Sequence, residues 1–182
     1  DKNQIIVGNG AAELLYAICR LPGYTGAFVP APGFSEYKEA LEASNIPVRD
    51  IFYRPREDDN GKPYFEVPYL ALETFAAELK GQDGRIIVFL GNPNNPDGTL
   101  LDKTHIRTVA SMLKDANSLL VIDESFIDFV GNEPLRDNDQ SMRSLVNEFD
   151  NVIVVHSFTK FYAVPGLRIG AAFGNEKLIS QL

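Results

Sequence analysis

The segment from Ser157 to Gly170 holds the residues that are best suited to chemistry. Lys160 follows an apolar run, comes just after two hydroxyl-bearing residues, Ser157 and Thr159, and precedes Arg168 across a Pro-Gly turn. A lysine among apolar and aromatic neighbours loses its proton more readily and can act as an amine nucleophile toward an aldehyde. The alternative, a surface lysine beside a turn, is the simpler interpretation of this segment taken alone.

Two carboxylates and an asparagine-rich loop follow other apolar runs. Asp123 and Glu124 come directly after Leu119–Ile122, so at least one of these carboxylates should lie below the surface, where it needs a partner. The segment 92–99 contains three asparagines and two prolines, and prolines restrict the backbone. Such a rigid loop can direct an asparagine side chain into a site, whereas the alternative is a turn that caps a helix at Asp102.

Paired acids also occur in metal sites, but the sequence does not favour such a site. The two histidines, His105 and His156, show no ligand spacing such as H-x-x-x-H. We therefore expect no bound metal, and we interpret His156 and the single cysteine, Cys19, as structural residues.

A glycine-rich turn near the start of the chain is another candidate binding element. Gly8 and Gly10 precede an apolar run that begins with Ala11 and Ala12. Small residues let a backbone approach a ligand, and the first N–H groups of a helix have no internal partner, so this turn could receive a phosphate. The alternative is a glycine turn capped by Asn9, and the segment lacks the third glycine of the dinucleotide-binding pattern.

Short apolar runs alternate with longer amphipathic runs, which indicates strands joined by crossover helices. The predicted helices are Ala11–Leu21, Ser35–Ser44, Pro68–Lys80, Asp102–Asn117 and Ser141–Phe149. The predicted strands are Gly26–Val29, Val48–Phe52, Arg85–Leu90, Ser118–Asp123, Val152–His156 and Leu167–Phe173. The sequence therefore predicts an α/β fold with a mostly parallel sheet. Because the carboxyl ends of parallel strands share one edge, where open α/β sheets bind ligands, we expect the candidate residues to converge there.

Turn formers concentrate between these elements, in the segments 29–33, 54–63, 91–99 and 131–138. The stretch 54–62 mixes both charge signs with turn formers, so we expect a solvated connecting loop there.

Length and composition exclude several classes of protein. With 182 residues, one domain is expected, and 45% hydrophobic residues supply a real core. The net charge of -8 argues against nucleic acid as the main partner, because a phosphate backbone requires a basic face. Only strand-sized apolar runs occur, so we expect no membrane crossing. The lone cysteine and the lack of a signal-like start favour a reducing cytoplasm.

Four motifs together resemble the fold-type I pyridoxal-phosphate enzymes of the class I and II aminotransferase family. They are Gly8-x-Gly10, Asn95-Pro96-x-Gly98, Asp123-x-x-Phe126, and Ser157-x-x-Lys160 followed by Arg168. The resemblance implies the three-layer α/β/α large domain of that family, with pyridoxal 5'-phosphate as the cofactor. It also implies a homodimer and a small phosphorylated amino-acid substrate.

The resemblance also implies a role for each matching residue. Lys160 would form a Schiff base with the cofactor aldehyde and later carry a proton at the substrate's α-carbon. Asp123 would pair with the pyridine nitrogen, Asn95 would donate to the phenolic oxygen, and Phe34 would stack on the ring. The residues implied as phosphate contacts are Gly10, Ala11, Ala12, Ser157, Thr159 and Arg168.

Within the family, the chain looks most similar to the L-threonine O-3-phosphate decarboxylases of cobalamin biosynthesis and to the histidinol-phosphate aminotransferases. The aminotransferases usually carry a tyrosine where this chain has Phe126, which favours decarboxylation to (R)-1-amino-2-propanol O-2-phosphate, with an aminotransferase as the alternative. Relatives often carry arginine in place of His156, which is a departure. A non-enzymatic ligand-binding domain is a further alternative, disfavoured because Lys160, Asp123 and Arg168 are all present.

The resemblance finally implies how much of such an enzyme the chain contains. Residues 1–182 are expected to be an incomplete cofactor-binding large domain, without the N-terminal segment and the small C-terminal domain that place the substrate. By itself, this part is expected to be inactive.

Overall fold

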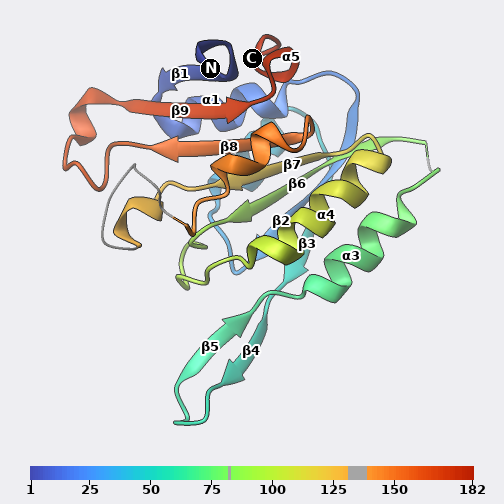
Figure 1. Ribbon diagram of the computed structural model, residues 1–182, viewed down its shortest axis with the longest axis vertical. Coiled ribbons are helices and arrows are strands. Elements are labelled where there is room, and N and C mark those ends of the chain that lie inside the picture. Colours follow the sequence, from blue (N-terminus) through green and yellow to red (C-terminus); the bar gives the residue numbers. More distant parts are fainter. Residues whose placement is uncertain (82, 131–138) are drawn as a thin grey trace.

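The computed structural model describes residues 1–81, 83–130 and 139–182. In these ranges, a seven-stranded sheet runs in the order β1-β9-β8-β7-β6-β2-β3 (Figure 1). Its strands are β1 (Ile5–Asn9), β2 (Tyr24–Ala31), β3 (Val48–Phe52), β6 (Arg85–Gly91), β7 (Leu119–Asp123), β8 (Val152–Ser157) and β9 (Ile169–Gly174). The α-helices are α1 (Gly10–Cys19), α2 (Glu36–Ala43), α3 (Tyr69–Glu78), α4 (Lys103–Asp115) and the short α5 (Glu176–Ile179).

The sheet is mostly parallel, as predicted. Strands β3, β2, β6, β7 and β8 pair in parallel, whereas β9 runs antiparallel to both β8 and β1. The ends of β1, β6, β7 and β8 and the start of β9 therefore lie at one edge of the sheet. The register confirms this arrangement, since Gly91 is opposite Asp123 and Ser157 is opposite Gly170.

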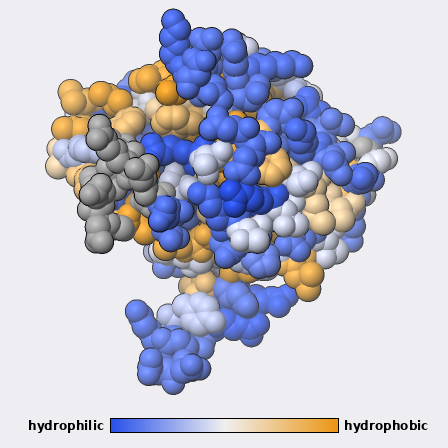
Figure 2. All heavy atoms as spheres, viewed as in Figure 1, coloured by the Kyte–Doolittle hydropathy of each residue, from blue (hydrophilic) through white to orange (hydrophobic). Residues whose placement is uncertain are grey.

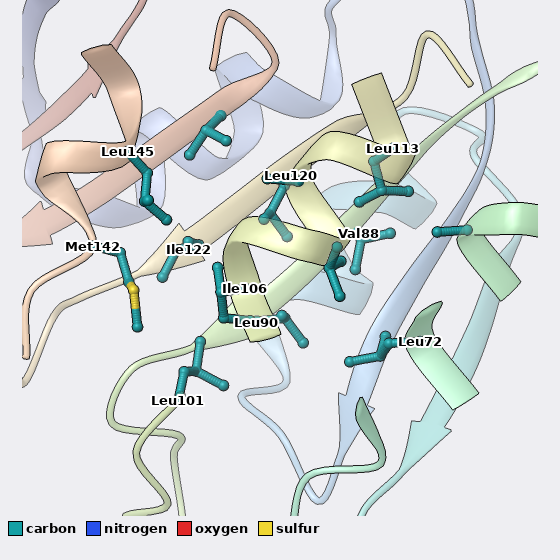
Figure 3. Packing of buried hydrophobic residues seen from close by; sticks show 14 of the residues in the cluster. Leu72, Val88, Leu90, Leu101, Ile106, Leu113, Leu120, Ile122, Met142 and Leu145 are labelled. Atoms are coloured by element: carbon teal, nitrogen blue, oxygen red, sulfur yellow. The ribbon is translucent and has the colours of Figure 1, made fainter. Parts of the chain in front are cut away.

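Helices cover both faces of the sheet and form two hydrophobic clusters. Helices α3 and α4 pack on one face, where Leu113, Leu120 and Ile122 belong to the first cluster (Figure 3). Helices α1 and α2 pack on the other face, with Leu15 and Phe89 in the second cluster. Because β7 and β8 are buried on both faces, their sequences are nearly continuous apolar runs. The fold is the predicted three-layer α/β/α arrangement.

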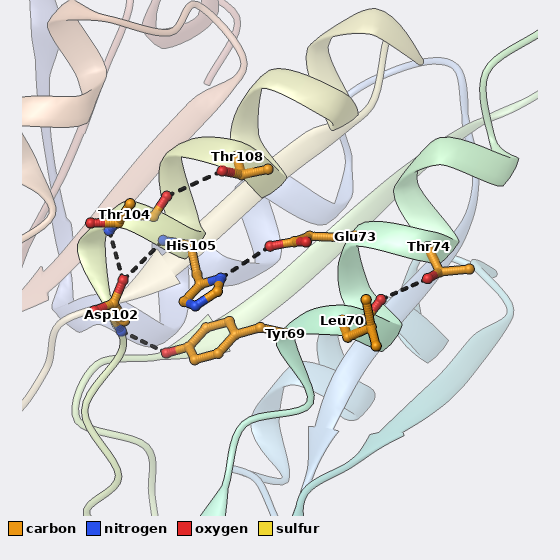
Figure 4. Close-up of polar contacts among 8 residues, drawn as sticks. All are labelled: Tyr69, Leu70, Glu73, Thr74, Asp102, Thr104, His105 and Thr108. Carbon is orange, nitrogen blue, oxygen red and sulfur yellow. Dashed lines mark hydrogen bonds and ion pairs between the residues drawn. The ribbon is translucent and has the colours of Figure 1, made fainter.

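The start of α4 is fixed by its own cap and by α3 (Figure 4). The Asp102 side chain accepts the backbone N–H groups of Thr104 and His105, at 2.9 and 3.0 Å, which satisfies two donors that have no helical partner. The Asp102 N–H donates to the Tyr69 hydroxyl of α3 at 2.6 Å, and the Tyr69 ring stacks on His105. Since Asp102 caps α4 by itself, the loop before it is not needed for this purpose.

The segment 54–62 was expected to be a loop, and this prediction was wrong. It forms much of a hairpin made of β4 (Arg54–Glu57) and β5 (Pro63–Glu66), which projects from the body of the molecule. An Arg56–Glu66 ion pair of 2.8 Å joins the strands. The hairpin is largely hydrophilic (Figure 2) and β4 is exposed along its whole length, so no alternation of apolar residues marked the strands.

Two other elements differ from the prediction. The segment Ser141–Phe149 contains a 3-10 helix at Arg143–Asn147 instead of an α-helix, and at its start the Met142 N–H donates to the buried Glu124 carboxylate. Strand β1 was missed because Gly8 and Asn9 are poor strand formers and its edge position leaves it half exposed. The predicted turn-rich segment 131–138 lies outside the described residues.

Among the described residues, no helix combines the length and the apolar character that crossing a membrane would require.

Candidate active site

The predicted site residues come from segments that end or begin at the carboxyl edge of the sheet. Asp123 ends β7, Ser157 ends β8, and Arg168 immediately precedes β9. Gly10 begins α1 directly after β1. The antiparallel pairing of β9 with its two neighbours brings the first and last parts of the chain together at this edge.

Asp123 lies at the centre of this edge and is only 6% exposed. The Tyr37 hydroxyl of α2 donates to Oδ2 of Asp123 at 3.0 Å, and the Ser125 backbone N–H donates to Oδ1 at 2.9 Å. A carboxylate can accept about four hydrogen bonds, so both oxygens retain acceptor capacity for a further donor. Asp123 is therefore oriented by the protein and still able to bind a cationic N–H group.

Lys160 lies in the loop between β8 and β9. Its Nζ is 4.4 Å from the centroid of the Phe126 ring, a cation–π distance. The side chain is exposed as a whole, but the loss of solvent around the amino group lowers the pKa of Lys160. The Arg168 charge lowers this pKa further, and the Asp123 charge opposes both effects. Lys160 is thus more readily available as a neutral amine than an ordinary surface lysine.

A cradle for an anion forms where α1 begins beside Arg168. A Cβ atom at Gly10, whose φ is +81°, would lie 2.7 Å from Nη2 of Arg168. A Cβ atom at Gly170 would lie 2.5 Å from the Ala11 nitrogen. Glycine at both positions therefore lets the guanidinium and β9 approach the first turn of α1, which contains Ala11 and Ala12 and offers unpaired N–H groups.

Two buried hydroxyls lie at and just after the end of β8, before Lys160. The Ser157 and Thr159 hydroxyls are 2.9 Å apart, and the residues are 3% and 7% exposed. The Asn9 side chain makes no capping hydrogen bond to α1, so the alternative of an asparagine-capped turn does not describe this segment.

The residues predicted to stack on the cofactor ring and to donate to its phenolic oxygen, Phe34 and Asn95, lie in the segments that follow β2 and β6. Phe34 is half-buried and meets Tyr37 edge-on, with ring centroids 5.6 Å apart. Asn95 is half-buried in the loop after β6, and its side chain makes no hydrogen bond within the part of the chain that the structure describes. Its neighbour Asn94 instead holds the loop, since its amide donates to the Pro32 carbonyl and to Asp97, both at 3.0 Å.

Three structural features of this edge were missed by the sequence analysis. Tyr37 was not assigned a contact, although it lies one helical turn after Phe34. Glu124 is fully buried and accepts hydrogen bonds from Asn92, Ser141 and Met142. His156 was expected to be a structural residue, but its partner was not predicted. Its Nε2 atom lies 2.9 Å from Oδ2 of Asp128, and both side chains are buried.

The side chains at this edge fit a cofactor that carries a phosphate, an aldehyde and a protonated ring nitrogen. Arg168 and the N–H groups of α1 suit the phosphate, Lys160 suits the aldehyde, and Asp123 suits the ring nitrogen. No cluster of three or more His, Cys, Asp or Glu side chains that could hold a metal occurs in residues 1–81, 83–130 and 139–182.

Comparison with known proteins identifies the family. The sequence profile of "Aminotransferase class I and II" matches residues 1–182. The chain is 33% identical to the adenosylcobalamin biosynthesis bifunctional protein CobDQ of Leptospira interrogans, over 98% of the chain and 19% of that protein. It is also 33% identical to histidinol-phosphate aminotransferase 2 of Psychrobacter arcticus, over 100% of the chain and 44% of that protein.

A solved structure shows the same fold. The L-threonine-O-3-phosphate decarboxylase from Porphyromonas gingivalis superposes with a TM-score of 0.71 at 27% identity, covering 100% of this chain and 47% of that one. The chain thus spans less than half the length of each of these three relatives. Sequence and fold agree, and the chain belongs to the aminotransferase class I and II family.

Proposed function

We propose that the protein is a pyridoxal-phosphate enzyme that acts at the α-carbon of a phosphorylated amino acid. One observation carries this proposal: Lys160, whose pKa is lowered, lies within electrostatic reach of both Asp123 and Arg168 at one sheet edge. These residues supply an amine, a carboxylate and an anion-binding guanidinium at the carboxyl edge of the sheet. Membership of the family supports the same cofactor.

The residues of this chain would hold the cofactor at three places. The Arg168 guanidinium, the first N–H groups of α1 and the Ser157 hydroxyl would bind the phosphate. Lys160 would hold the aldehyde carbon through Nζ, and Asp123 would accept the N–H of the ring. When bound, pyridoxal phosphate supplies a conjugated ring that takes up the electron pair left at the α-carbon.

Asp123 and Lys160 then have distinct tasks during the reaction. The Asp123 carboxylate stabilises a proton on the ring nitrogen, which keeps the ring electron-poor. Lys160 would move a proton at the α-carbon through Nζ. Its lowered pKa suits this task, since a proton carrier works best with a pKa near the working pH.

For the bond that breaks, we propose the one between the α-carbon and the carboxylate, in L-threonine O-3-phosphate. Carbon dioxide leaves, a proton is added to the same carbon, and (R)-1-amino-2-propanol O-2-phosphate is formed without a second substrate. Phe126 supports this choice, because its ring lies next to the Lys160 amino group and brings no hydroxyl there. The likeness to the decarboxylase from Porphyromonas gingivalis supports the same reaction.

The second candidate is histidinol-phosphate amino transfer, in which Lys160 removes the α-proton and a keto acid completes the cycle. The identity of 33% to the aminotransferase from Psychrobacter arcticus, the same as to CobDQ of Leptospira interrogans, favours this alternative. Both candidates need the same cofactor contacts and differ in which substituent of the α-carbon leaves.

The test uses the full-length protein loaded with pyridoxal phosphate. Carbon dioxide release from L-threonine O-3-phosphate is measured, and amino transfer from histidinol phosphate to 2-oxoglutarate is measured in parallel, with Lys160→Ala as the control. We expect carbon dioxide release that the Lys160→Ala variant abolishes. Amino transfer without carbon dioxide release would instead establish the aminotransferase.

A further inference from the structure

Tyr37 connects two candidate cofactor contacts that come from distant parts of the sequence. Its hydroxyl donates to Oδ2 of Asp123 at 3.0 Å, and its ring meets the Phe34 ring edge-on at 5.6 Å. We infer that Tyr37 is a positioning residue for the cofactor, which orients the Asp123 carboxylate for the ring nitrogen and fixes the Phe34 ring. This inference rests on the proposed function.

The Tyr37 hydroxyl is held as a hydrogen-bond donor. Tyr37 is 2% exposed, and burial, followed by the Asp123 charge, raises the pKa of its hydroxyl well above 10.0. The hydroxyl therefore keeps its proton over the whole physiological pH range. Because a neutral phenol beside a carboxylate donates to it, Oδ2 of Asp123 receives a charge-assisted hydrogen bond.

Asp123 needs this contact in order to adopt a single orientation. The terminal torsion of an aspartate side chain has a broad energy well, so packing alone fixes the carboxylate plane poorly. The Ser125 N–H fixes Oδ1, and the Tyr37 hydroxyl fixes Oδ2 from another element, α2. Because both oxygens are held, the carboxylate plane is oriented before a cofactor binds. Such preorganisation increases the affinity for the ligand, since less conformational freedom is lost on binding.

Tyr37 is itself fixed by packing. Its ring stacks on Phe89 of β6, with centroids 5.2 Å apart and an interplanar angle of 14°. Phe89 is fully buried in the centre of the sheet. Packing against the core therefore fixes Tyr37. Its hydrogen bond to Asp123 and its ring contact with Phe34 then position these two side chains.

Tyr53 provides a matched control for the loss of a buried hydroxyl. It is 4% exposed, and its hydroxyl has no hydrogen-bond partner among the residues that the structure describes. A Tyr53→Phe change therefore removes the same chemical group as Tyr37→Phe, but it breaks no contact to Asp123. A desolvated hydroxyl without a partner contributes nothing favourable, so its removal should not weaken the fold.

The experiment measures how the full-length apoprotein takes up pyridoxal phosphate, with the wild type, Tyr37→Phe, Tyr53→Phe and Lys160→Ala compared. We expect Tyr37→Phe to raise the dissociation constant about tenfold, the effect of one hydrogen bond to a charged group. At saturation, the visible circular dichroism of the bound cofactor should also decrease, because this signal depends on the orientation of the ring. Tyr53→Phe should match the wild type in both readouts, and thermal unfolding of the apoproteins checks that all variants fold.

The outcomes separate this inference from the proposed function. A wild type that takes up no cofactor, or that binds it as Lys160→Ala does, overturns the proposed function and this inference with it. A wild type that binds through Lys160, together with a Tyr37→Phe variant that matches Tyr53→Phe in affinity and circular dichroism, overturns this inference alone.

Discussion

Asp123 and Glu124 are neighbours in the sequence, yet they lie in two differently built regions of the same sheet edge. Asp123 contacts α2 through Tyr37, receives two protein donors and keeps free acceptor capacity. Glu124 turns to the opposite side, where the Ser141 hydroxyl donates at 2.7 Å, the Met142 N–H at 2.5 Å and the Asn92 amide at 3.2 Å. Glu124 is 0% exposed, whereas Asp123 is 6% exposed.

The difference shows how a buried carboxylate can serve either the fold or a ligand. Burial raises the pKa of Glu124, and its hydrogen bonds and the Arg143 charge oppose this effect without cancelling it. The acceptors of Glu124 are used by groups of the protein itself. This carboxylate fastens the segment that starts at Ser141 to the end of β7. Asp123 retains acceptor capacity for a further donor, which is what its proposed contact with the ring nitrogen requires.

The largest expected effect is on activity, from Asp123→Asn. We expect turnover to decrease about 10³-fold, since a neutral amide no longer stabilises a proton on the ring nitrogen. The unfolding free energy should change by about 1 kcal/mol, the contribution of one hydrogen bond. Turnover assays and urea denaturation of the same preparations check the two values. Unchanged turnover would show that the Asp123 carboxylate has no role in the reaction, and the proposed difference from Glu124 would be wrong.

The largest expected effect on stability comes from Glu124→Ala. The variant leaves the Ser141 hydroxyl and the Met142 N–H without this acceptor and removes one of the two acceptors of the Asn92 amide, so the unfolding free energy should decrease by about 3 kcal/mol. Denaturation of the apoprotein measures this decrease. For the molecules that remain folded, cofactor affinity should match the wild type. If affinity decreased as strongly as stability did, the two regions would not be separate.

The Gly10→Ala variant tests the proposed phosphate contacts next to Arg168. Its new Cβ atom would meet the Arg168 guanidinium, so we expect the affinity for pyridoxal phosphate to decrease about tenfold, the loss of one charge-assisted contact. Gly61→Ala is the matched control, because Gly61 has a φ of +75° and open space around it at the hairpin tip. Both variants should lose about 1 kcal/mol of stability from backbone strain, and equal cofactor affinities would contradict the role of Gly10.

The smallest expected effect is a pH dependence of the unfolding free energy that arises from His156. Because side chains alternate along β8, His156 lies on the same face of the sheet as Glu124. Burial lowers the pKa of His156 from 6.5, with the Arg143 charge adding to this and the charges of Asp128 and Asp123 opposing it. As the pH falls through 6.5, the unfolded chain therefore takes up a proton before the folded one does, and the unfolding free energy decreases.

The pH effect is measured by comparing the wild type with His156→Gln. Because one proton is involved, the unfolding free energy can decrease by at most about 1.4 kcal/mol per pH unit. The decrease should stop once the pH is below the lowered pKa of His156 in the folded state. Denaturation curves at several pH values around 6.5 give the difference between the proteins. A His156→Gln variant with the same pH dependence as the wild type would show that another group is responsible.

The sequence by itself determined the elements whose physical cause is local. The apolar runs of β6, β7 and β8 predicted buried parallel strands, because each is covered on both faces. The positions of Asp123 and Lys160 just after such strands predicted that both residues lie at one sheet edge. The resemblance added the cofactor and the implied role of each residue.

Only the tertiary structure decided which distant groups meet. Tyr37 and Asp123 are 86 positions apart, and the approach of Gly10 to Arg168 depends on β9 running antiparallel beside β1. The hairpin β4–β5 and the saturation of Glu124 likewise had no local signature. Residue types and periodicity report burial and secondary structure, whereas contacts between distant residues depend on strand order and register, which are fixed when the whole core packs.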